Sequence, residues 1–184
     1  MEGYFIGIDG GGTNSRLLAC DSQGEVIGKS FGNSTNIESN SPESVKKNLD
    51  KLVTDFLISS GSTMKDCLGI CLGTAGVDTK KTLQEMERIA GSLSYPCPVY
   101  VCNDAQIALA AQTRGEPGIL IISGTGSIGY GVNEQGQGKR VGGYGYLVGD
   151  EGSSYWLGRK AITASLQAHD GIGTQTMLLS MILE

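Results

Sequence analysis

Residues 6–21, IGIDGGGTNSRLLACD, place an aspartate, three consecutive glycines and a threonine between two short apolar runs. Two apolar runs joined by a glycine-rich turn are typical of a β-hairpin. Glycines also let backbone N–H groups approach a ligand closely, and concave arrangements of such groups bind anions. The stretch therefore predicts a hairpin whose turn is either a plain structural turn, with Asp9 accepting local N–H bonds, or part of a phosphate site.

The spacing of apolar residues predicts the elements that follow this turn. Together with residues 4–9 and 15–20, residues 25–31 complete an antiparallel three-stranded meander. Ser41 and Pro42 are typical of a helix N-cap and first position, and Gly61 of its end. Further along, periodicity predicts strands at 67–72 and 99–102 and helices at 79–93 and 104–114. The first 114 residues are thus expected to form a βββαβαβα unit.

The pattern starts again after the linker-like residues 115–118. Strand 119–122 enters the turn SGTGS, residues 123–127, and leaves it as strand 128–132, much as the first strand enters and leaves GGGTN. Each turn leads into a strand, whereas the P-loop and the dinucleotide fingerprint lead into a helix. Two such turns facing each other could hold a phosphate chain between them. We expect two domains, residues 1–114 and 118–184.

Composition narrows the class of ligand. The 184 residues contain 39% hydrophobic and 18% charged residues, which is ordinary for a globular protein. A net charge of -5 argues against a nucleic-acid partner, and no apolar run approaches the roughly 18 residues that span a bilayer. The five cysteines form no C-x-x-C pair and are expected to be reduced core thiols. We expect a cytoplasmic protein that binds a small ligand.

Six stretches in this order resemble the N-acetylglucosamine kinase branch of the BadF/BadG/BcrA/BcrD ATPase family, within the actin, Hsp70 and sugar-kinase superfamily. They are DGGGT at 9–13, STN at 34–36, GTAG at 73–76, ND at 103–104, SGTGS at 123–127 and GGYGYLVGDEGSSYW at 142–156. The resemblance implies an α/β fold of the actin-like ATPase (ribonuclease H-like) type, with the βββαβαβα unit duplicated. The second unit is expected to be incomplete and to lack the adenine-binding region, either as a fragment or with the remainder supplied by another chain.

The resemblance also implies two phosphate-binding turns and a magnesium ligand. In the first turn Gly10, Gly11, Gly12 and Thr13 would contact the phosphates of ATP. Asp9 would hold Mg²⁺, through water. The second turn would contact the same phosphates through Gly124, Thr125 and Gly126. A hairpin turn without a ligand remains the alternative for both.

Asn103 and Asp104 follow a predicted strand and precede a predicted helix. This is a usual place for an N-cap, and it is equally where a general base could face a cleft. In the resembled family this position deprotonates the attacking sugar hydroxyl, which makes Asp104 the expected catalytic residue, with Asn103 beside the substrate.

Sugar recognition is implied by position in the matched motifs. Asparagine and aspartate side chains can bond to sugar hydroxyls, and an aromatic ring offers a flat apolar face to a pyranose. A glycine-rich loop that caps the helix starting near Ser153 is the alternative. The chain departs from N-acetylglucosamine kinases at one position, because it has Tyr144 where they carry tryptophan. The identity of the sugar substrate is therefore left open. The expected substrate-binding residues are Asn36, Asn103, Ser127, Ile128, Gly143, Tyr144, Gly145 and Asp150.

The resemblance therefore implies an ATP-dependent sugar kinase that uses Mg²⁺ and phosphorylates N-acetylglucosamine or a related amino sugar or hexose at the 6-hydroxyl. The alternative is an ATPase activator of the 2-hydroxyacyl-CoA dehydratase or benzoyl-CoA reductase type, whose iron–sulfur cluster bridges two subunits. A sugar-responsive regulator is disfavoured because no helix-turn-helix precedes the first strand. The expected partners are the sugar and ATP, not nucleic acid or membrane, with a homodimer left open.

Overall fold

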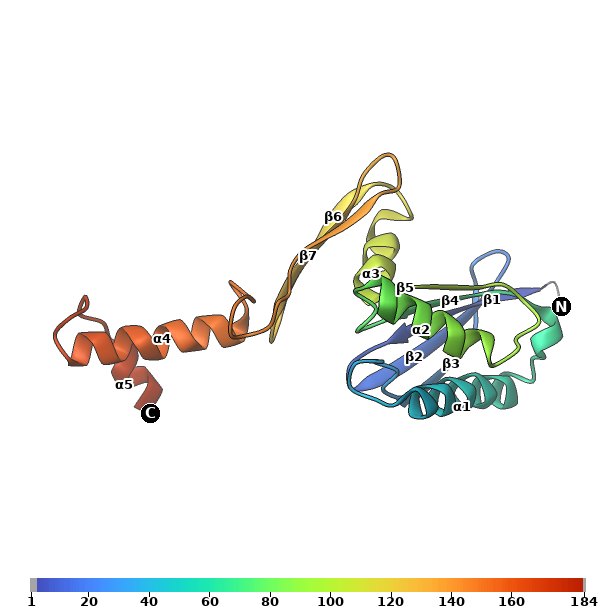
Figure 1. Cartoon of the computed structure of the whole chain (residues 1–184), viewed down its shortest axis with the longest axis horizontal. Coiled ribbons are helices and arrows are strands. Elements are labelled where there is room, and N and C mark those ends of the chain that lie inside the picture. The colour runs from blue at the N-terminus through green and yellow to red at the C-terminus, as the bar shows by residue number, and fades with distance from the viewer. Residues whose placement is uncertain (1–2, 184) are drawn as a thin grey trace. The chain divides into compact units, whose positions relative to one another are not determined.

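The computed structural model describes residues 3–183. Contacts along the chain divide it into two units, Met1–Ala111 and Gln112–Glu184. Figure 1 follows the chain from the blue and green elements of the amino-terminal unit to the yellow, orange and red elements of the second unit. Each unit is built around its own sheet, with five strands in the first and three in the second among the described residues.

The first unit contains a mixed five-stranded sheet in the order β3-β2-β1-β4-β5. Strands β1, β2 and β3 form the antiparallel meander that the turn chemistry predicts. Strands β4 and β5 then continue the sheet in parallel with β1. The bounds are β1 (Tyr4–Gly10), β2 (Asn14–Asp21), β3 (Val26–Asn33), β4 (Cys67–Thr74) and β5 (Val99–Asn103).

The first helix of this unit begins and ends where its capping residues predict. Helix α1 (Pro42–Ser60) starts with Pro42 after Ser41, whose Oγ accepts a hydrogen bond from the Ser44 N–H at 3.3 Å. It ends at Gly61, which has a left-handed φ of 69°. A 3₁₀ turn (Met64–Asp66), helix α2 (Lys80–Gly91) and helix α3 (Asp104–Thr113) complete the unit. The predicted βββαβαβα order is confirmed.

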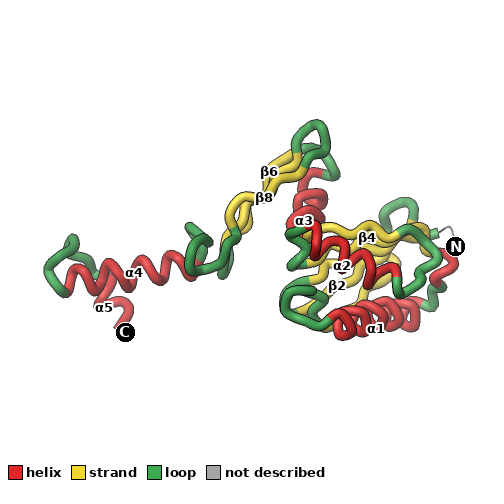
Figure 2. Tube along the Cα trace, in the orientation of Figure 1, coloured by secondary structure: helices red, strands yellow, loops and turns green. Residues whose placement is uncertain are grey.

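One face of the five-stranded sheet carries the core of the unit. Tyr4, Ile6 and Ile8 alternate along β1 with exposed residues and are buried. Phe56 of α1 meets the Tyr4 ring edge to face, with centroids 5.7 Å apart, and Met86 of α2 is fully buried in the same cluster. Both helices thus cover this face (Figure 2). Each such buried side chain contributes roughly 1.5–3 kcal/mol.

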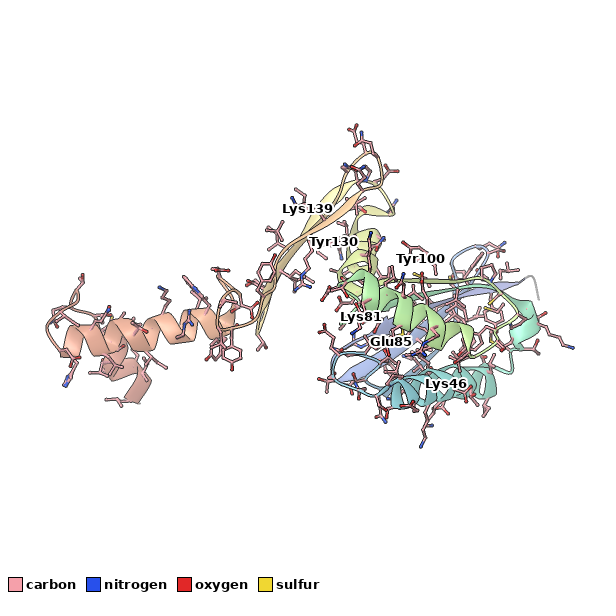
Figure 3. The ribbon with its side chains drawn as sticks, in the orientation of Figure 1. Lys46, Lys81, Glu85, Tyr100, Tyr130 and Lys139 are labelled. Carbon is pink, nitrogen blue, oxygen red and sulfur yellow. The ribbon has the colours of Figure 1, made fainter. Side chains whose placement is uncertain are left out.

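Helix α3 covers part of the opposite face. A Cβ on Gly73 of β4 would lie 2.6 Å from Ile107 Cγ2, so the missing side chain lets α3 approach the strand closely. Tyr100 of β5 lies on this face (Figure 3), and its hydroxyl accepts a hydrogen bond from Gln106 of α3 at 3.1 Å. The amino terminus of α3 is thereby fixed at the edge where the parallel strands end.

The second unit is built from a three-stranded antiparallel sheet in the order β6-β7-β8 and two helices. Strand β6 carries large exposed side chains, with Ile119 at 81% and Ile121 at 77% exposed. Helix α4 is capped by Ser153, whose Oγ accepts the Trp156 N–H at 3.1 Å. The bounds are β6 (Gly118–Ser123), β7 (Ser127–Val132), β8 (Gly138–Gly142), α4 (Ser154–His169) and α5 (Leu178–Leu183).

None of the helices in the described part of the chain has the length and apolar character that crossing a membrane requires.

Candidate functional site

The glycine turn of the first unit is a tight connection between β1 and β2. The Gly11 N–H donates to the Asn14 carbonyl at 3.0 Å, which closes the hairpin around Gly12 and Thr13. Ser34 Oγ donates to the Gly11 carbonyl at 3.0 Å, and the Ala75 N–H donates to the Gly10 carbonyl at 2.8 Å. The loop after β3 and the loop after β4 therefore both hold this turn in place.

Two buried threonines lie under Gly10. Thr35 and Thr74 are fully buried, and their hydroxyl oxygens are 3.4 Å apart. A Cβ on Gly10 would lie 2.7 Å from Thr74 Oγ1 and would clash with Thr35 Oγ1. Close packing therefore requires glycine at this position. The turn that is predicted to bind phosphate rests on two buried threonine side chains.

Asp9 points to the sheet face that α3 covers. It pairs with Gly73 across β1 and β4, and paired residues on neighbouring strands share a face. Because α3 packs against Gly73, the exposed Asp9 side chain and the first residue of α3 lie on the same face at the same edge. The structure thus brings together the predicted metal ligand Asp9 and the predicted base Asp104.

Asp104 begins α3 and is half-buried. Its Oδ1 accepts a hydrogen bond from the Ala105 N–H at 2.8 Å. The pKa of Asp104 is raised above its ordinary value, chiefly because burial disfavours the charged carboxylate, and the negative charges of Asp78 and Asp9 raise it further. The Ala105 hydrogen bond acts in the opposite direction. A carboxylate with raised basicity is suited to accept a proton.

Asn103 caps the amino terminus of α3, which was one of the two roles considered for Asn103 and Asp104. Its Oδ1 accepts the Ala105 N–H at 2.8 Å, and its Nδ2 donates to Asp78 Oδ1 at 2.6 Å. Asp78, in the loop after β4, is a site residue that the motifs do not indicate. Its position in the sequence does indicate this edge of the sheet, because Asp78 follows the end of β4 and the ends of parallel strands meet at one edge.

Asn36 lies between the first glycine turn and the loop after β4. Its Oδ1 accepts the Glu38 N–H at 2.8 Å, and its Nδ2 is 3.9 Å from where a Cβ on Gly12 would be. A Cβ on Gly76, which has a φ of 83°, would lie 2.5 Å from Asn36 Oδ1. The half-buried Asn36 is thus held at the same edge as Asp9 and Asp104.

The second glycine turn is held by the loop that precedes α4. The Gly124 N–H donates to the Gly126 carbonyl at 2.9 Å, and the Gly124 carbonyl accepts the Ser154 N–H at 2.8 Å. Ser127 Oγ donates to the Glu151 carbonyl at 2.8 Å. Two motifs that are separate in the sequence, SGTGS and GDEGS, therefore form one local structure in the second unit. The turn leaves Thr125 exposed.

Asp150 is the most constrained residue of this second group. It is only 8% exposed, has a φ of 61°, and its Oδ1 accepts the Ser127 N–H at 3.3 Å. A Cβ on Gly126 would lie 3.0 Å from Asp150 Oδ2. Tyr144 is 73% exposed, Ile128 is half-buried, and neighbouring Gly143 and Gly145 both have a positive φ. The predicted residues thus form two groups, one in each unit.

The donor set limits how a metal ion could be held. Between residues 3 and 183, no three histidine, cysteine, aspartate or glutamate side chains are grouped closely enough to bind a metal by themselves. Mg²⁺ usually keeps several waters and takes one or two carboxylates together with substrate phosphates. The exposed carboxylate of Asp9 next to a glycine turn fits that mode of binding.

Four of the five cysteines form two close pairs, each between β4 and the segment leading into and through β5. Cys97 Sγ lies 3.5 Å from Cys67 Sγ, and burial raises the pKa of Cys67 to about 12. A hydrogen bond from the Cys102 thiol lowers the pKa of Cys71 to about 7, against the opposing effect of burial. All of them are free thiols in this structure, and Cys102 directly precedes Asn103 and Asp104.

Comparisons with known proteins agree with the motifs. The model of the BadF/BadG/BcrA/BcrD ATPase family matches residues 6–181. The chain is 41% identical over 181 residues to an N-acetylmuramic acid/N-acetylglucosamine kinase of Clostridium acetobutylicum. It is 34% identical over 193 residues to an N-acetyl-D-glucosamine kinase of Dictyostelium discoideum. Each match covers 98% of this chain and 59% of the relative.

A solved structure supports the fold. A Chromobacterium violaceum protein assigned as an N-acetylglucosamine kinase superposes with a TM-score of 0.70 at 27% identity, over 98% of this chain and 62% of that one. The predicted actin-like α/β fold is thereby confirmed. The chain spans less than two thirds of the length of these relatives.

Proposed function

Because the chain belongs to the BadF/BadG/BcrA/BcrD ATPase family, we propose that it is part of an ATP-dependent kinase for N-acetylglucosamine or a related amino sugar or hexose. The proposed acceptor is the 6-hydroxyl. One observation carries the proposal: a half-buried carboxylate of raised pKa, Asp104, lies at the same sheet edge as the glycine turn. The named activities of the two curated relatives support the choice of an amino sugar.

Asp104 is the proposed general base. A base held at the end of a strand can accept the proton of a sugar hydroxyl while the hydroxyl oxygen attacks the terminal phosphorus of ATP. Burial and the charges of Asp78 and Asp9 raise the pKa of Asp104, and so favour transfer of a proton to it. Asn103 and Asn36, at the same edge, are the proposed sugar ligands of the first unit.

The phosphates of ATP are the proposed ligands of both glycine turns. In the first unit, Gly12 and Thr13 form the exposed tip of the hairpin, where a ligand can reach backbone N–H groups. In the second unit, Gly124, Thr125 and Gly126 would act in the same way. Asp9 would hold Mg²⁺ through water, and the ion, when bound, would neutralise negative charge on the phosphates.

The proposed sugar ligands of the second unit are the residues grouped around Asp150. Asp150 has a buried carboxylate that can accept from sugar hydroxyls, and Ser127 and Ile128 follow the glycine turn. The exposed ring of Tyr144, between two glycines of positive φ, offers an apolar face to a pyranose. Tyrosine replaces the tryptophan expected in N-acetylglucosamine kinases, so this position is a proposed determinant of sugar choice.

Sugar-dependent formation of ADP tests the proposal. The longest natural chain that contains these residues would be assayed with ATP and Mg²⁺, with and without N-acetylglucosamine, N-acetylmuramic acid, glucosamine and glucose. Release of ADP that depends on one of these sugars, together with mass-spectrometric detection of the sugar phosphate, would support the kinase. ATP hydrolysis that is indifferent to all of them would contradict it and direct attention to the electron-transfer ATPases of the family.

A further inference from the structure

Asp78 contacts the residue next to the proposed base, although no motif includes it. Asn103 Nδ2 donates to Asp78 Oδ1 at 2.6 Å, a contact that joins the loop after β4 to the end of β5. Thr74 and Asn103 are paired in the parallel register, so both loops leave the sheet at the same level. The hydrogen bond spans 25 positions in the sequence and is a tertiary contact rather than a local turn.

This contact fixes which way the Asn103 amide faces. An ionised aspartate can only accept hydrogen bonds, and a backbone N–H can only donate. The Asn103 NH₂ group must therefore face Asp78, and its oxygen must face the Ala105 N–H, which it reaches at 2.8 Å. The reverse orientation would place two acceptors together at Asp78 and two donors together at Ala105.

The same backbone N–H is shared by the proposed base. Asp104 Oδ1 also accepts a hydrogen bond from the Ala105 N–H, at 2.8 Å. Asn103 and Asp104 therefore share one backbone donor at the start of α3. If the Asn103 amide were released, the first turn of α3 would lose one of the two acceptors at that N–H. The carboxylate of Asp104 would then be the one remaining side-chain acceptor at that N–H, and it could rotate away from its present position.

We propose that Asp78 is a positioning residue that holds the Asn103 amide in its capping orientation and, through it, places the carboxylate of Asp104. Asp78 acts on Asp104 through Asn103 and has no assigned contact with substrate. The catalytic consequence rests on the proposed kinase function, whereas the effect on the Asn103 amide rests on the hydrogen bonds alone.

Two substitutions separate the hydrogen bond from the charge of Asp78. Asp78→Ala removes both, while Asp78→Asn keeps an oxygen that can accept from Asn103 Nδ2 and removes only the charge. With the longest natural chain, we expect Asp78→Ala to lower kcat by about 10- to 100-fold, since small displacements of a catalytic group have effects of this size. The KM for ATP should change less than twofold. Asp78→Asn should retain most of the wild-type kcat.

The matched control is Asp55→Ala, which removes a partly exposed carboxylate from α1. Asp55 pairs with Lys51 at 2.7 Å, and exposed pairs of this kind contribute little to stability. Its kcat should equal that of the wild type. A kcat for Asp78→Ala within twofold of the wild type would overturn the inference. So would an equal loss in Asp78→Asn and Asp78→Ala, because the charge and not the hydrogen bond would then be responsible.

Nuclear magnetic resonance tests the geometry independently of activity. In the wild type, the Asn103 side-chain N–H that bonds to Asp78 and the Ala105 N–H should exchange with solvent more slowly than unbonded amides do. Asp78→Ala should accelerate both, and Asp78→Asn should accelerate them much less. If wild-type ATP turnover proved independent of sugar, the proposed function would fail while these signals still tested the contact. Unchanged exchange in Asp78→Ala would overturn the inference whatever the activity, and comparison with Asp78→Asn guards against a variant that folds poorly.

Discussion

Thr74 Oγ1 lies 3.1 Å from the Gly10 carbonyl oxygen and donates to it, which joins the end of β4 to the end of β1 beneath the first glycine turn. The same hydroxyl is 3.2 Å from the Thr35 carbonyl. Thr74 is fully buried, so water cannot replace these contacts. A single buried hydroxyl therefore links the three motifs DGGGT, STN and GTAG, which are far apart in the sequence.

Replacing this hydroxyl should destabilise the protein and loosen the turn. Thr74→Val keeps the shape but removes the donor, and a buried hydrogen bond contributes about 1 kcal/mol. The loss should be near that value because the Gly10 carbonyl keeps its bond from the Ala75 N–H at 2.8 Å. Urea unfolding measures it, with Thr54→Val on the exposed surface of α1 as the control. Equal stability of the two variants would contradict the prediction.

A methyl group at Gly10 should be more damaging than one at another glycine. Gly10→Ala would place a Cβ against the hydroxyls of Thr35 and Thr74, and overpacking of a tight core costs about 1–3 kcal/mol. Gly91→Ala is the matched control, because a Cβ there meets nothing within 4 Å and alanine favours the helix. Thermal unfolding and ATP binding by calorimetry would both be measured. Wild-type ATP affinity in a folded Gly10→Ala protein would argue against the first turn as the phosphate site.

Local sequence signals predicted most of the secondary structure because they act over short distances. Ser41, Pro42 and Gly61 bound α1 as their capping preferences indicate, and the meander follows from glycine-rich turns. Helix α5 (Leu178–Leu183) was not predicted, since a mostly apolar segment of six residues is too short to show a helical period.

The candidate site could be predicted from motifs only in part. Motifs indicated Asp9, Asn36 and Asp104, and the structure places all three at one sheet edge. Asp78 was missed because no motif includes it: its place after the end of β4 indicates the edge, but its hydrogen bond to Asn103 joins two loops that are distant in the sequence. The raised pKa of Asp104 was likewise hidden, because it arises from burial and from charges of two other segments.

Asp104→Asn, which removes the proposed general base, should lower turnover but stabilise the fold at neutral pH. Loss of a general base lowers the rate about 10²- to 10⁴-fold. The folded-state pKa of Asp104 is raised, so the folded protein binds its proton more tightly than the unfolded chain does. Stability therefore falls as pH rises from the unfolded value, about 3.9, through the folded value.

Asparagine cannot ionise and avoids that loss. The gain in the free energy of unfolding relative to wild type should be present at pH 7 and absent below about pH 3. Urea unfolding at both pH values measures it. A variant that is less stable than wild type at pH 7 would contradict the assigned direction of the pKa shift.

The thiol of Cys71 should be more reactive than its neighbours. With a pKa lowered to about 7 by the Cys102 thiol, Cys71 is largely thiolate at pH 8, whereas burial raises the pKa of Cys67 to about 12. Iodoacetamide at pH 8 should therefore label Cys71 first, as peptide mass spectrometry would show. Cys102→Ala should move the midpoint of labelling to higher pH, and an unmoved midpoint would exclude the hydrogen bond as the cause.

Substitution of Asp150 tests the proposed sugar-binding residues of the second unit. Its carboxylate is buried and accepts the Ser127 N–H at 3.3 Å, while its φ of 61° is a conformation that asparagine also adopts readily. Asp150→Asn can therefore keep the backbone and the Ser127 contact while removing the charge. Thermal unfolding should stay close to that of the wild type, whereas β-branched Asp150→Val should unfold at a lower temperature.

The kinetic consequence of Asp150→Asn should fall on the sugar. A hydrogen bond to a charged group contributes about 1.5–3 kcal/mol, so its loss should raise the KM for the sugar about 10-fold or more. The KM for ATP should change little, because the phosphates are proposed ligands of the glycine turns. Asp170→Asn, at the exposed end of α4, is the control and should leave both constants unchanged. If the KM for ATP rose instead, Asp150 would belong to the nucleotide site, through its contacts with Gly126 and Ser127 at the glycine turn.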